Sequence, residues 1–147
     1  MPKIAFELNG AAVTADAPDD KPLLYVLRND FDCKSVRFGC GAVLVDGRKA
    51  LACTLPTGAV AGKAVLTVEG LGDAANPHPI QEAFLQEQAG QCGYCLSGLI
   101  IATKALLDGN AAPSREETIA ALDDHLCRCG AHVRILRAVD AAAEALR

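Results

Sequence analysis

Four cysteines in the second half of the chain have the spacing of a metal site. Cys92 and Cys95 form one close pair, and Cys127 and Cys129 form another about thirty residues later. Two such pairs are the ligand set of a tetrahedral sulfur site, which holds zinc or an iron–sulfur cluster. Spacing alone does not separate the two metals, so both interpretations stay open at this point.

Each pair adjoins a predicted helix. Residues 92–107 are strongly apolar and end at Asp108-Gly109-Asn110, a helix C-terminal signal. Because Cys92 and Cys95 are three residues apart, we expect their thiolates on one face of the opening turn of this helix. The free amides of a helix N-terminus favour an anionic cluster and the thiolate form. The second pair falls at a corner between two helices, where both sulfurs can face one site.

The rest of the second half is also predicted to be helical. A proline opens the helix predicted over 79–88. Ser114 and Glu117 form a capping box at the start of a helix that should run to Leu126. Residues 132–146 carry one apolar face, made by Ile135, Leu136, Val139, Ala142, Ala143 and Leu146. Four helices of this length predict a compact four-helix bundle.

The first half has the period of strands. Ile4, Phe6 and Leu8 alternate with polar residues before an Asn9-Gly10 turn, and residues 43–53 form a second hairpin around Asp46-Gly47. A short amphipathic helix over 22–29 and a strand over 64–68 complete a mixed sheet that clasps one helix, which is a β-grasp. We therefore predict an α+β chain: a β-grasp domain over 1–72, a linker over 73–78, and a helical domain over 79–147 that holds the four cysteines.

Composition excludes several function classes. A formal net charge of −4 argues against nucleic acid as a partner, and no stretch approaches the roughly twenty apolar residues needed to cross a bilayer. The first residues lack the features of a secretory signal. Seven cysteines without a signal predict reduced thiols used for metal. These features favour the cytoplasm, and export bound to a signal-bearing partner is left open.

The motifs together carry a family resemblance. Gly90-Gln91-Cys92-Gly93-Tyr94-Cys95 and Leu126-Cys127-Arg128-Cys129-Gly130 look like the small iron–sulfur subunit of the molybdenum hydroxylases, the xanthine oxidase and aldehyde oxidoreductase family. Leu23–Arg28, Phe38–Gly41, Val43–Gly47 and Cys53 extend the resemblance over nearly the whole chain in the family's order. Cys-Arg-Cys followed by Gly130-Ala131-His132 is closest to the isoquinoline and nicotinate dehydrogenase small subunits.

The resemblance implies an electron-transfer role without catalytic residues in this chain. A large partner subunit would bind molybdopterin and oxidise the substrate, and electrons would leave through this subunit to an acceptor such as a cytochrome or flavin. Cys92, Cys95, Cys127 and Cys129 would hold the [2Fe-2S] cluster nearer the molybdenum. Gln91 and Cys129 match the positions that contact the pterin, although by itself Gln91 is equally well explained as a polar helix cap.

The N-terminal site departs from the family pattern. A plant-type [2Fe-2S] site needs C-x4-C-x2-C and a distant fourth cysteine. Here Phe38-Gly39-Cys40-Gly41-Ala42 runs straight into a strand, so only Cys40 and Cys53 remain at matching positions. Two thiols cannot supply four ligands. The sequence predicts one cluster and puts the second in doubt, while Cys33 is interpreted as a buried core thiol.

The remaining residue types give weaker signals. His78, His125 and His132 share no close spacing and are interpreted as polar or cap positions, with His125 near enough to Cys127 to tune the site. Adjacent Asp123 and Asp124 point to different helix faces, so they do not form a catalytic pair. Two other functions stay open: a free-standing ferredoxin-like carrier, and a zinc-stabilised interaction module.

Overall fold

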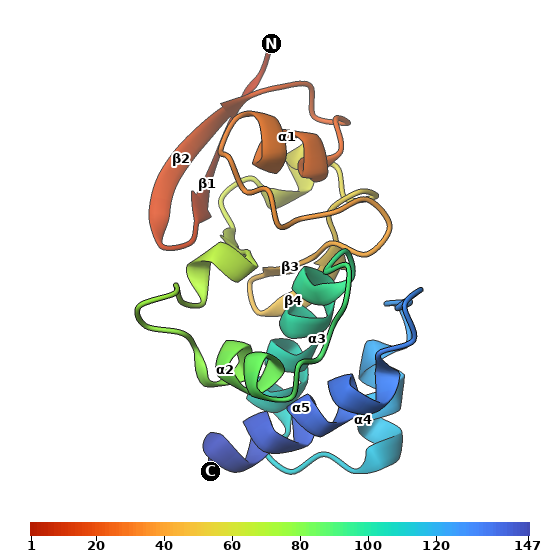
Figure 1. The fold of residues 1–147 in the computed structure, drawn as a ribbon. Coiled ribbons are helices and arrows are strands. Elements are labelled where there is room, and N and C mark those ends of the chain that lie inside the picture. The colour runs from red at the N-terminus through yellow and green to blue at the C-terminus, as the bar shows by residue number, and fades with distance from the viewer.

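A computed structural model describes residues 1–147, and it contains five α-helices and one five-stranded sheet. The sheet and the first helix lie at the end of the molecule that holds the N-terminus, and the other helices lie at the opposite end (Figure 1). This is a mixed α/β arrangement in which the strands precede most of the helices along the chain.

The sheet has the order β2-β1-β5-β3-β4. Strands β1 (Lys3–Leu8) and β2 (Ala11–Asp16) form an antiparallel hairpin, and β3 (Ala42–Val45) and β4 (Arg48–Leu51) form another. The predicted Asn9-Gly10 and Asp46-Gly47 turns are confirmed, with all four residues at positive φ. Strand β5 (Ala64–Leu66) joins the hairpins, parallel to β1 and antiparallel to β3.

Helix α1 (Leu23–Asn29) packs its apolar face into the core of this half. That core contains fifteen buried residues, among them Cys33, which is 5% exposed as expected for a core thiol. Two short 3-10 helices, η1 (Thr57–Val60) and η2 (Val68–Gly70), lie in the connections around β5.

The second half contains α2 (Pro79–Gln86), α3 (Leu96–Gly109), α4 (Arg115–Leu122) and α5 (His132–Ala145), which enclose a separate core of seventeen buried residues. The predicted capping box is confirmed, since the Glu117 N–H donates to Ser114 Oγ and the Ser114 N–H donates to Glu117. His78 is a cap as well: its side chain accepts from the Ile80 N–H at 3.2 Å.

Two predicted helix boundaries are wrong. Helix α3 begins at Leu96 rather than Cys92, because Gly93 takes a φ of +82° that a right-handed helix cannot contain. Helix α4 ends at Leu122 rather than Leu126, and the Leu126 side chain is 66% exposed. Leu126 stands at the interval expected for the buried face of this helix, but the chain has already left the helix at that point.

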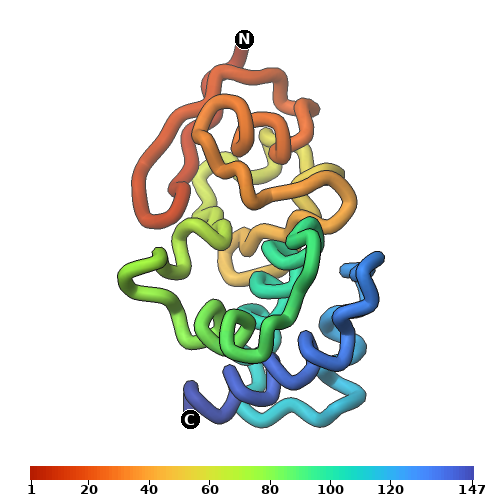
Figure 2. The backbone as a smooth tube through the Cα atoms, viewed as in Figure 1, coloured from red at the N-terminus to blue at the C-terminus, as the bar shows by residue number.

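The two halves share a contact surface. Ala42 and Leu44 of β3 form a small buried cluster with Ile101, which lies in the middle of α3. Figure 2 shows the loop before β3 close to the chain that leads into α3, where several contacts described below join them. None of the helices is long and apolar enough to cross a bilayer.

Candidate metal centre

The four cysteines of the second half line one cavity of about 310 Å³. Its walls come from two short segments, residues 91–95 ahead of α3 and residues 126–129 between α4 and α5. The two close pairs, Cys92 with Cys95 and Cys127 with Cys129, therefore converge on one cavity. Cys95 and Cys127 are buried, Cys129 is half-buried and Cys92 is exposed, so the cavity has an inner and an outer side.

The thiols face one another across the two segments rather than within them. Cys92 interacts with the side chain of Cys129, and Cys95 interacts with that of Cys127. No group of three or more His, Cys, Asp and Glu side chains lies close enough together to hold a single metal ion. The interacting thiols are thus Cys92 with Cys129 and Cys95 with Cys127.

Backbone amides donate hydrogen bonds to two of the thiols, those of Cys92 and Cys127. The Tyr94 N–H donates to Cys92 Sγ at 3.5 Å, and the pKa of Cys92 is lowered by this bond and by the Cys129 side chain. The Ala131 N–H donates to Cys127 Sγ at 3.4 Å. Burial alone would raise the pKa of Cys127, but that amide and the Cys95 side chain bring it below its ordinary value.

Cys95 behaves in the opposite way. Burial and the neighbouring Cys127 raise the pKa of Cys95 to about 12, so its thiolate is costly without a cation. Nearby, Ser97 Oγ is buried without a hydrogen-bond partner in the chain. A buried hydroxyl of this kind is a donor that no protein group uses.

The turn that carries the first pair depends on glycine. Gly93, between the two cysteines, has a φ of +82°, a backbone conformation that a residue with a Cβ rarely adopts. The cysteines therefore lie on a left-handed turn ahead of α3, and the sequence-based placement of both within its first helical turn is wrong. Gln91 and Arg128 line the cavity and are exposed. Neither side chain is therefore part of the buried core.

The loop before β3 packs directly on this turn. The Tyr94 hydroxyl donates to the Phe38 carbonyl at 2.8 Å, and the Arg37 guanidinium lies 5.7 Å from the centre of the Tyr94 ring. A second contact is closer still: a Cβ added at Gly98 of α3 would lie 1.8 Å from the Cys40 carbonyl oxygen. The loop before β3 thus packs onto the start of α3.

His125 makes a further connection between the halves. The residue is 4% exposed, its Nδ1 lies 3.0 Å from the Cys40 carbonyl and its Nε2 lies 3.4 Å from Lys49 Nζ. Lys49 on β4 also pairs with Asp124 at 3.1 Å. His125 therefore bonds across to the sheet and not to Cys127. Sequence reasoning missed Lys49, because a lysine on a hairpin gives no signal of a contact seventy-six residues away.

Cys40 and Cys53 are not among the residues that line this cavity. Cys40 precedes β3 and Cys53 follows β4, at the open end of this hairpin. There the Gly41 carbonyl accepts from the Ala52 N–H at 3.1 Å. Both thiols are half-buried, and neither lines the cavity of the four C-terminal cysteines. Cys33 lies in the core beneath the sheet, whereas the cavity cysteine Cys95 is near enough to Cys40 for their charges to interact.

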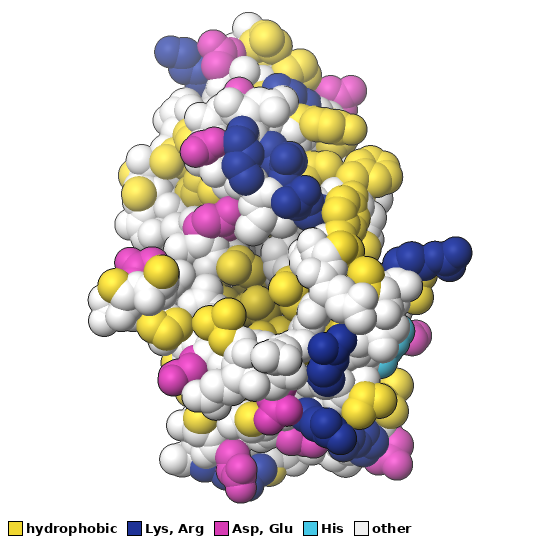
Figure 3. Space-filling model, in the orientation of Figure 1, with side chains coloured by type: hydrophobic (Ala, Val, Ile, Leu, Met, Phe, Trp, Pro, Cys, Tyr) yellow, Lys and Arg dark blue, Asp and Glu magenta, His cyan; other side chains and the backbone are white.

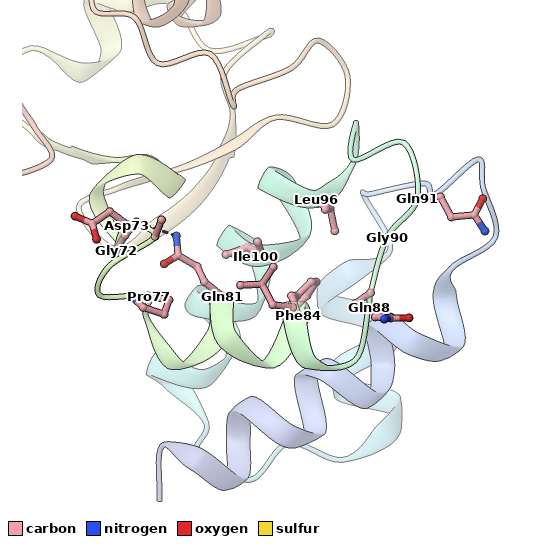
Figure 4. Close-up of a pocket in the computed structure, with 13 residues that line it drawn as sticks. Gly72, Asp73, Pro77, Gln81, Phe84, Gln88, Gly90, Gln91, Leu96 and Ile100 are labelled. Carbon is pink, nitrogen blue, oxygen red and sulfur yellow. Dashed lines mark hydrogen bonds between the residues drawn. The ribbon is translucent and has the colours of Figure 1, made fainter.

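A larger cavity of about 560 Å³ lies on the other side of Gln91. Figure 4 shows Phe84, Leu96 and Ile100 of α2 and α3 in its wall, with Gly72 and Asp73 of the preceding loop at its far end. On the same side of the molecule, Figure 3 shows a hollow with an apolar floor between the two halves. The exposed Leu85 side chain also borders this cavity.

Comparison with known proteins decides the family. Residues 67–140 match the model of the [2Fe-2S] binding domain, a range that includes the four cavity cysteines. The chain belongs to this family. It is 47% identical to a nicotinate dehydrogenase subunit of Pseudomonas putida over 98% of this chain and 96% of that protein. It is 41% identical to the alpha subunit of isoquinoline 1-oxidoreductase of Brevundimonas diminuta, over 96% of this chain and 97% of that protein.

Solved structures agree with the sequence matches. Aldehyde oxidoreductase of Desulfovibrio desulfuricans superposes with a TM-score of 0.94 at 36% identity, covering all of this chain and 17% of that one. Quinoline 2-oxidoreductase of Pseudomonas putida 86 superposes with a TM-score of 0.91 at 28% identity, covering 98% and 94% of the two chains. The alignment with the nicotinate dehydrogenase subunit spans 151 positions, whereas this chain has 147 residues. The nicotinate dehydrogenase subunit therefore carries residues that this chain lacks.

Proposed function

We propose that this chain is the iron–sulfur electron-transfer subunit of a molybdopterin-dependent hydroxylase or dehydrogenase. The observation that carries the proposal is that four cysteines line one cavity within a [2Fe-2S] binding domain. Relatives that match this chain over nearly their whole length are subunits of nicotinate dehydrogenase and isoquinoline 1-oxidoreductase. In such a complex the chain contributes to an oxidoreductase without a catalytic residue of its own.

The donor set fits a two-iron group better than a single zinc ion. Zinc requires four sulfurs about 2.3 Å from one centre, whereas each iron of a [2Fe-2S] cluster takes two thiolates. We propose that Cys92 and Cys129 ligate one iron and that Cys95 and Cys127 ligate the other, since these are the thiols that face each other. When bound, the cluster supplies a centre that accepts and releases one electron.

The chain's own residues prepare that site. The Tyr94 and Ala131 amides direct positive dipoles at Cys92 and Cys127 and so stabilise negative charge on those sulfurs. Iron would offset the cost of the buried Cys95 thiolate. Sequestration of the inner pair limits water around the site, while exposed Cys92 gives the outer pair a short path to a partner.

We propose that this outer side faces the molybdopterin of the large partner subunit, with Gln91 and Cys129 as the contacting residues. The exposure of Gln91 beside the outer pair supports this orientation. Electrons would then leave toward a cytochrome or flavin acceptor. Cysteines without disulfides favour the cytoplasm as the compartment.

For the fold we propose a β-grasp domain over residues 1–72, a linker over 73–78 and a four-helix bundle over 79–147. The five-stranded sheet with α1 and the separate core of α2–α5 support this division. We further propose that the β-grasp domain holds no cluster, because only Cys40 and Cys53 remain at matching positions and two thiols cannot supply four ligands.

The deciding experiment measures iron, zinc and acid-labile sulfide per chain, together with low-temperature EPR after dithionite reduction. We expect two irons, two sulfides and one rhombic signal. Four irons with two signals would contradict the loss of the N-terminal cluster. Zinc without sulfide would support the interaction module instead, and a monomer that carries a redox-active centre without any large partner would support the free carrier.

A Cys95→Ser variant tests the ligand assignment. We expect it to lose the visible absorbance of the cluster and the turnover of the complex, because serine cannot replace a buried thiolate ligand there. Cys33→Ser is the matched control, as Cys33 lies in the other core, and it should keep the absorbance. Unchanged absorbance and activity in Cys95→Ser would refute the assignment.

A further inference from the structure

The segment between α4 and α5 holds Cys127 and Cys129 without the support of a helix or strand. Every backbone hydrogen bond of this segment joins residues no more than four positions apart, such as the His125 N–H to the Leu122 carbonyl at 2.9 Å. None of these bonds ties it to a distant part of the chain. The place of the two cysteines in the molecule therefore depends on side-chain contacts.

Lys49, on the edge strand β4, reaches this segment from the sheet. Its Nζ donates to the Ala121 carbonyl at 3.2 Å and to Asp124 Oδ2 at 3.1 Å, and it lies 3.4 Å from His125 Nε2. A lysine at this place caps a terminal carbonyl of α4 and meets the negative end of the helix dipole. The Lys49 side chain is only 21% exposed. One ammonium thus holds the chain at three points immediately ahead of Cys127.

The chemistry of its neighbours fixes the proton on the His125 ring. A lysine ammonium has three donors and no acceptor, so Nε2 of His125 accepts from Lys49. A carbonyl oxygen only accepts, so Nδ1, which lies 3.0 Å from the Cys40 carbonyl, carries the proton. His125 is therefore neutral, and hydrogen bonds are donated in one direction, from Lys49 through the ring to Cys40.

The other cysteine segment is tied to the same part of the first half. The Tyr94 hydroxyl donates to the Phe38 carbonyl at 2.8 Å, and Phe38 lies two residues before Cys40 in the loop that leads into β3. This loop therefore contacts both cysteine segments, and β4 is the strand next to β3. A shift of residues 121–125 relative to the loop would change how the two close pairs of cysteines face each other.

We propose that Lys49 is a positioning residue for the cluster, acting through the end of α4 and through the neutral His125 ring. The inference rests on the proposed function in taking Cys127 and Cys129 as ligands. The sheet supplies no ligand to this cluster, yet through Lys49 it sets where one of the two ligand segments lies.

The experiment measures iron release to a strong chelator and the EPR spectrum of the reduced cluster, in the full cluster-loaded chain. We expect Lys49→Met to release iron several-fold faster than wild type and to change the g values, because the ligand segment is no longer fixed. Lys49→Arg keeps a charged donor and should restore most of both properties. Lys63→Met is the matched control, since it removes the same charge from an exposed residue, and it should behave as wild type.

Two variants of His125 test the direction of donation. An asparagine side chain has an N–H donor and a carbonyl acceptor, so His125→Asn should keep part of the connection between Lys49 and the Cys40 carbonyl. His125→Phe fills the same space with neither group. We expect iron release from His125→Phe to be as fast as from Lys49→Met, and release from His125→Asn to be slower than both.

A second control separates positioning from general stability. Val65→Ala removes volume from the sheet core, away from residues 121–125, so it should lower the unfolding free energy and leave the g values unchanged. Wild-type release rates and g values in Lys49→Met would overturn the proposal, and so would equal changes of the g values in Lys49→Met and Val65→Ala. If the chain holds zinc without sulfide, the proposed function fails, whereas the same order of release rates, measured for zinc, would still support the positioning role.

Discussion

Gly98 marks the tightest point between the two halves. It lies in α3 three residues after Cys95, and a Cβ there would meet both the Cys40 carbonyl at 1.8 Å and His125 Nδ1 at 2.6 Å. These neighbours are backbone and a buried ring, neither of which can move freely. The absence of a side chain at this residue therefore allows the loop, the histidine and the helix to meet beside the cavity.

We predict that Gly98→Ala destabilises the chain by about 1–3 kcal/mol, the usual cost of overpacking. The unfolding free energy from urea titration measures this effect. Gly109→Ala is the matched control: it lies at the end of the same helix, nothing lies within 4 Å of an added Cβ, and alanine should be neutral or slightly stabilising there. Equal effects at the two positions would contradict the packing argument.

The roles of some residues could be predicted from the sequence, and those of others could not. The four cavity cysteines could be grouped because their spacing is local and chemically specific. The Tyr94 bond to Phe38 and the Lys49 contact with His125 could not, since each joins segments more than fifty residues apart and neither residue type implies a partner. The pairing of Cys92 with Cys129 also depends on how the two segments approach, which spacing does not encode.

At the scale of elements, capping signals were reliable and apolar periodicity was less so. Ser114 with Glu117 placed the start of α4 correctly, because a cap is a local hydrogen bond. The ends that failed, at Cys92 and Leu126, are those next to the cavity. There the backbone leaves the helix so that cysteines on irregular turns can face each other.

One element is anchored by a carboxylate. Glu69 of η2 accepts from the Ser35 N–H at 3.0 Å and from the Ser35 hydroxyl at 2.6 Å, and so fixes the loop after α1 to the segment after β5. Desolvation alone would raise the pKa of Glu69. The hydrogen bonds from Ser35 and Thr67 outweigh it, and the pKa lies below its ordinary value of 4.5.

The sign of the pH effect follows from this lowered pKa. The Glu69 contribution to stability is fully present above about pH 4.5 and is lost as the pH falls through the folded-state pKa. We predict that Glu69→Gln lowers the unfolding free energy at pH 7 and that its difference from wild type shrinks below pH 4.5. Glu7→Gln, on an exposed strand position, is the control. A difference that is constant from pH 7 to pH 3 would be incompatible with this assignment.

At the scale of the whole molecule, the proposed ligands belong to one half and their packing neighbours belong to both. Cys95 and Cys127 are members of the helical core, while Cys40 and His125 connect the cavity region to the sheet. The general division into a strand-rich first half and a helical second half could be predicted from sequence periods. Their mutual fit could not, because it depends on close approaches such as that at Gly98.

We predict that chelation of iron loosens the helical half more than the sheet. Without the metal, the buried Cys95 and Cys127 revert to thiols and the segments 91–95 and 126–131 lose the group that joins them. Hydrogen exchange should therefore rise in these segments and in α4, with β1 and β2 little changed. A uniform rise over the chain, or none at all, would contradict a local role for the metal.

The parallel pairing of β1 with β5 has a consequence for the kinetics of folding. It joins Glu7 to Ala64 and Leu8 to Val65, and the Asn9 side chain fastens it by accepting from the Thr67 N–H at 2.8 Å. Both hairpins of the sheet are local, whereas this pairing must close a long loop before any contact rewards it. Val65→Ala should then mainly accelerate unfolding, while Val43→Ala in the local hairpin should slow refolding, as stopped-flow rates can measure. The two hairpins would thus form early, and β5 would join them into one sheet only after the rate-limiting step.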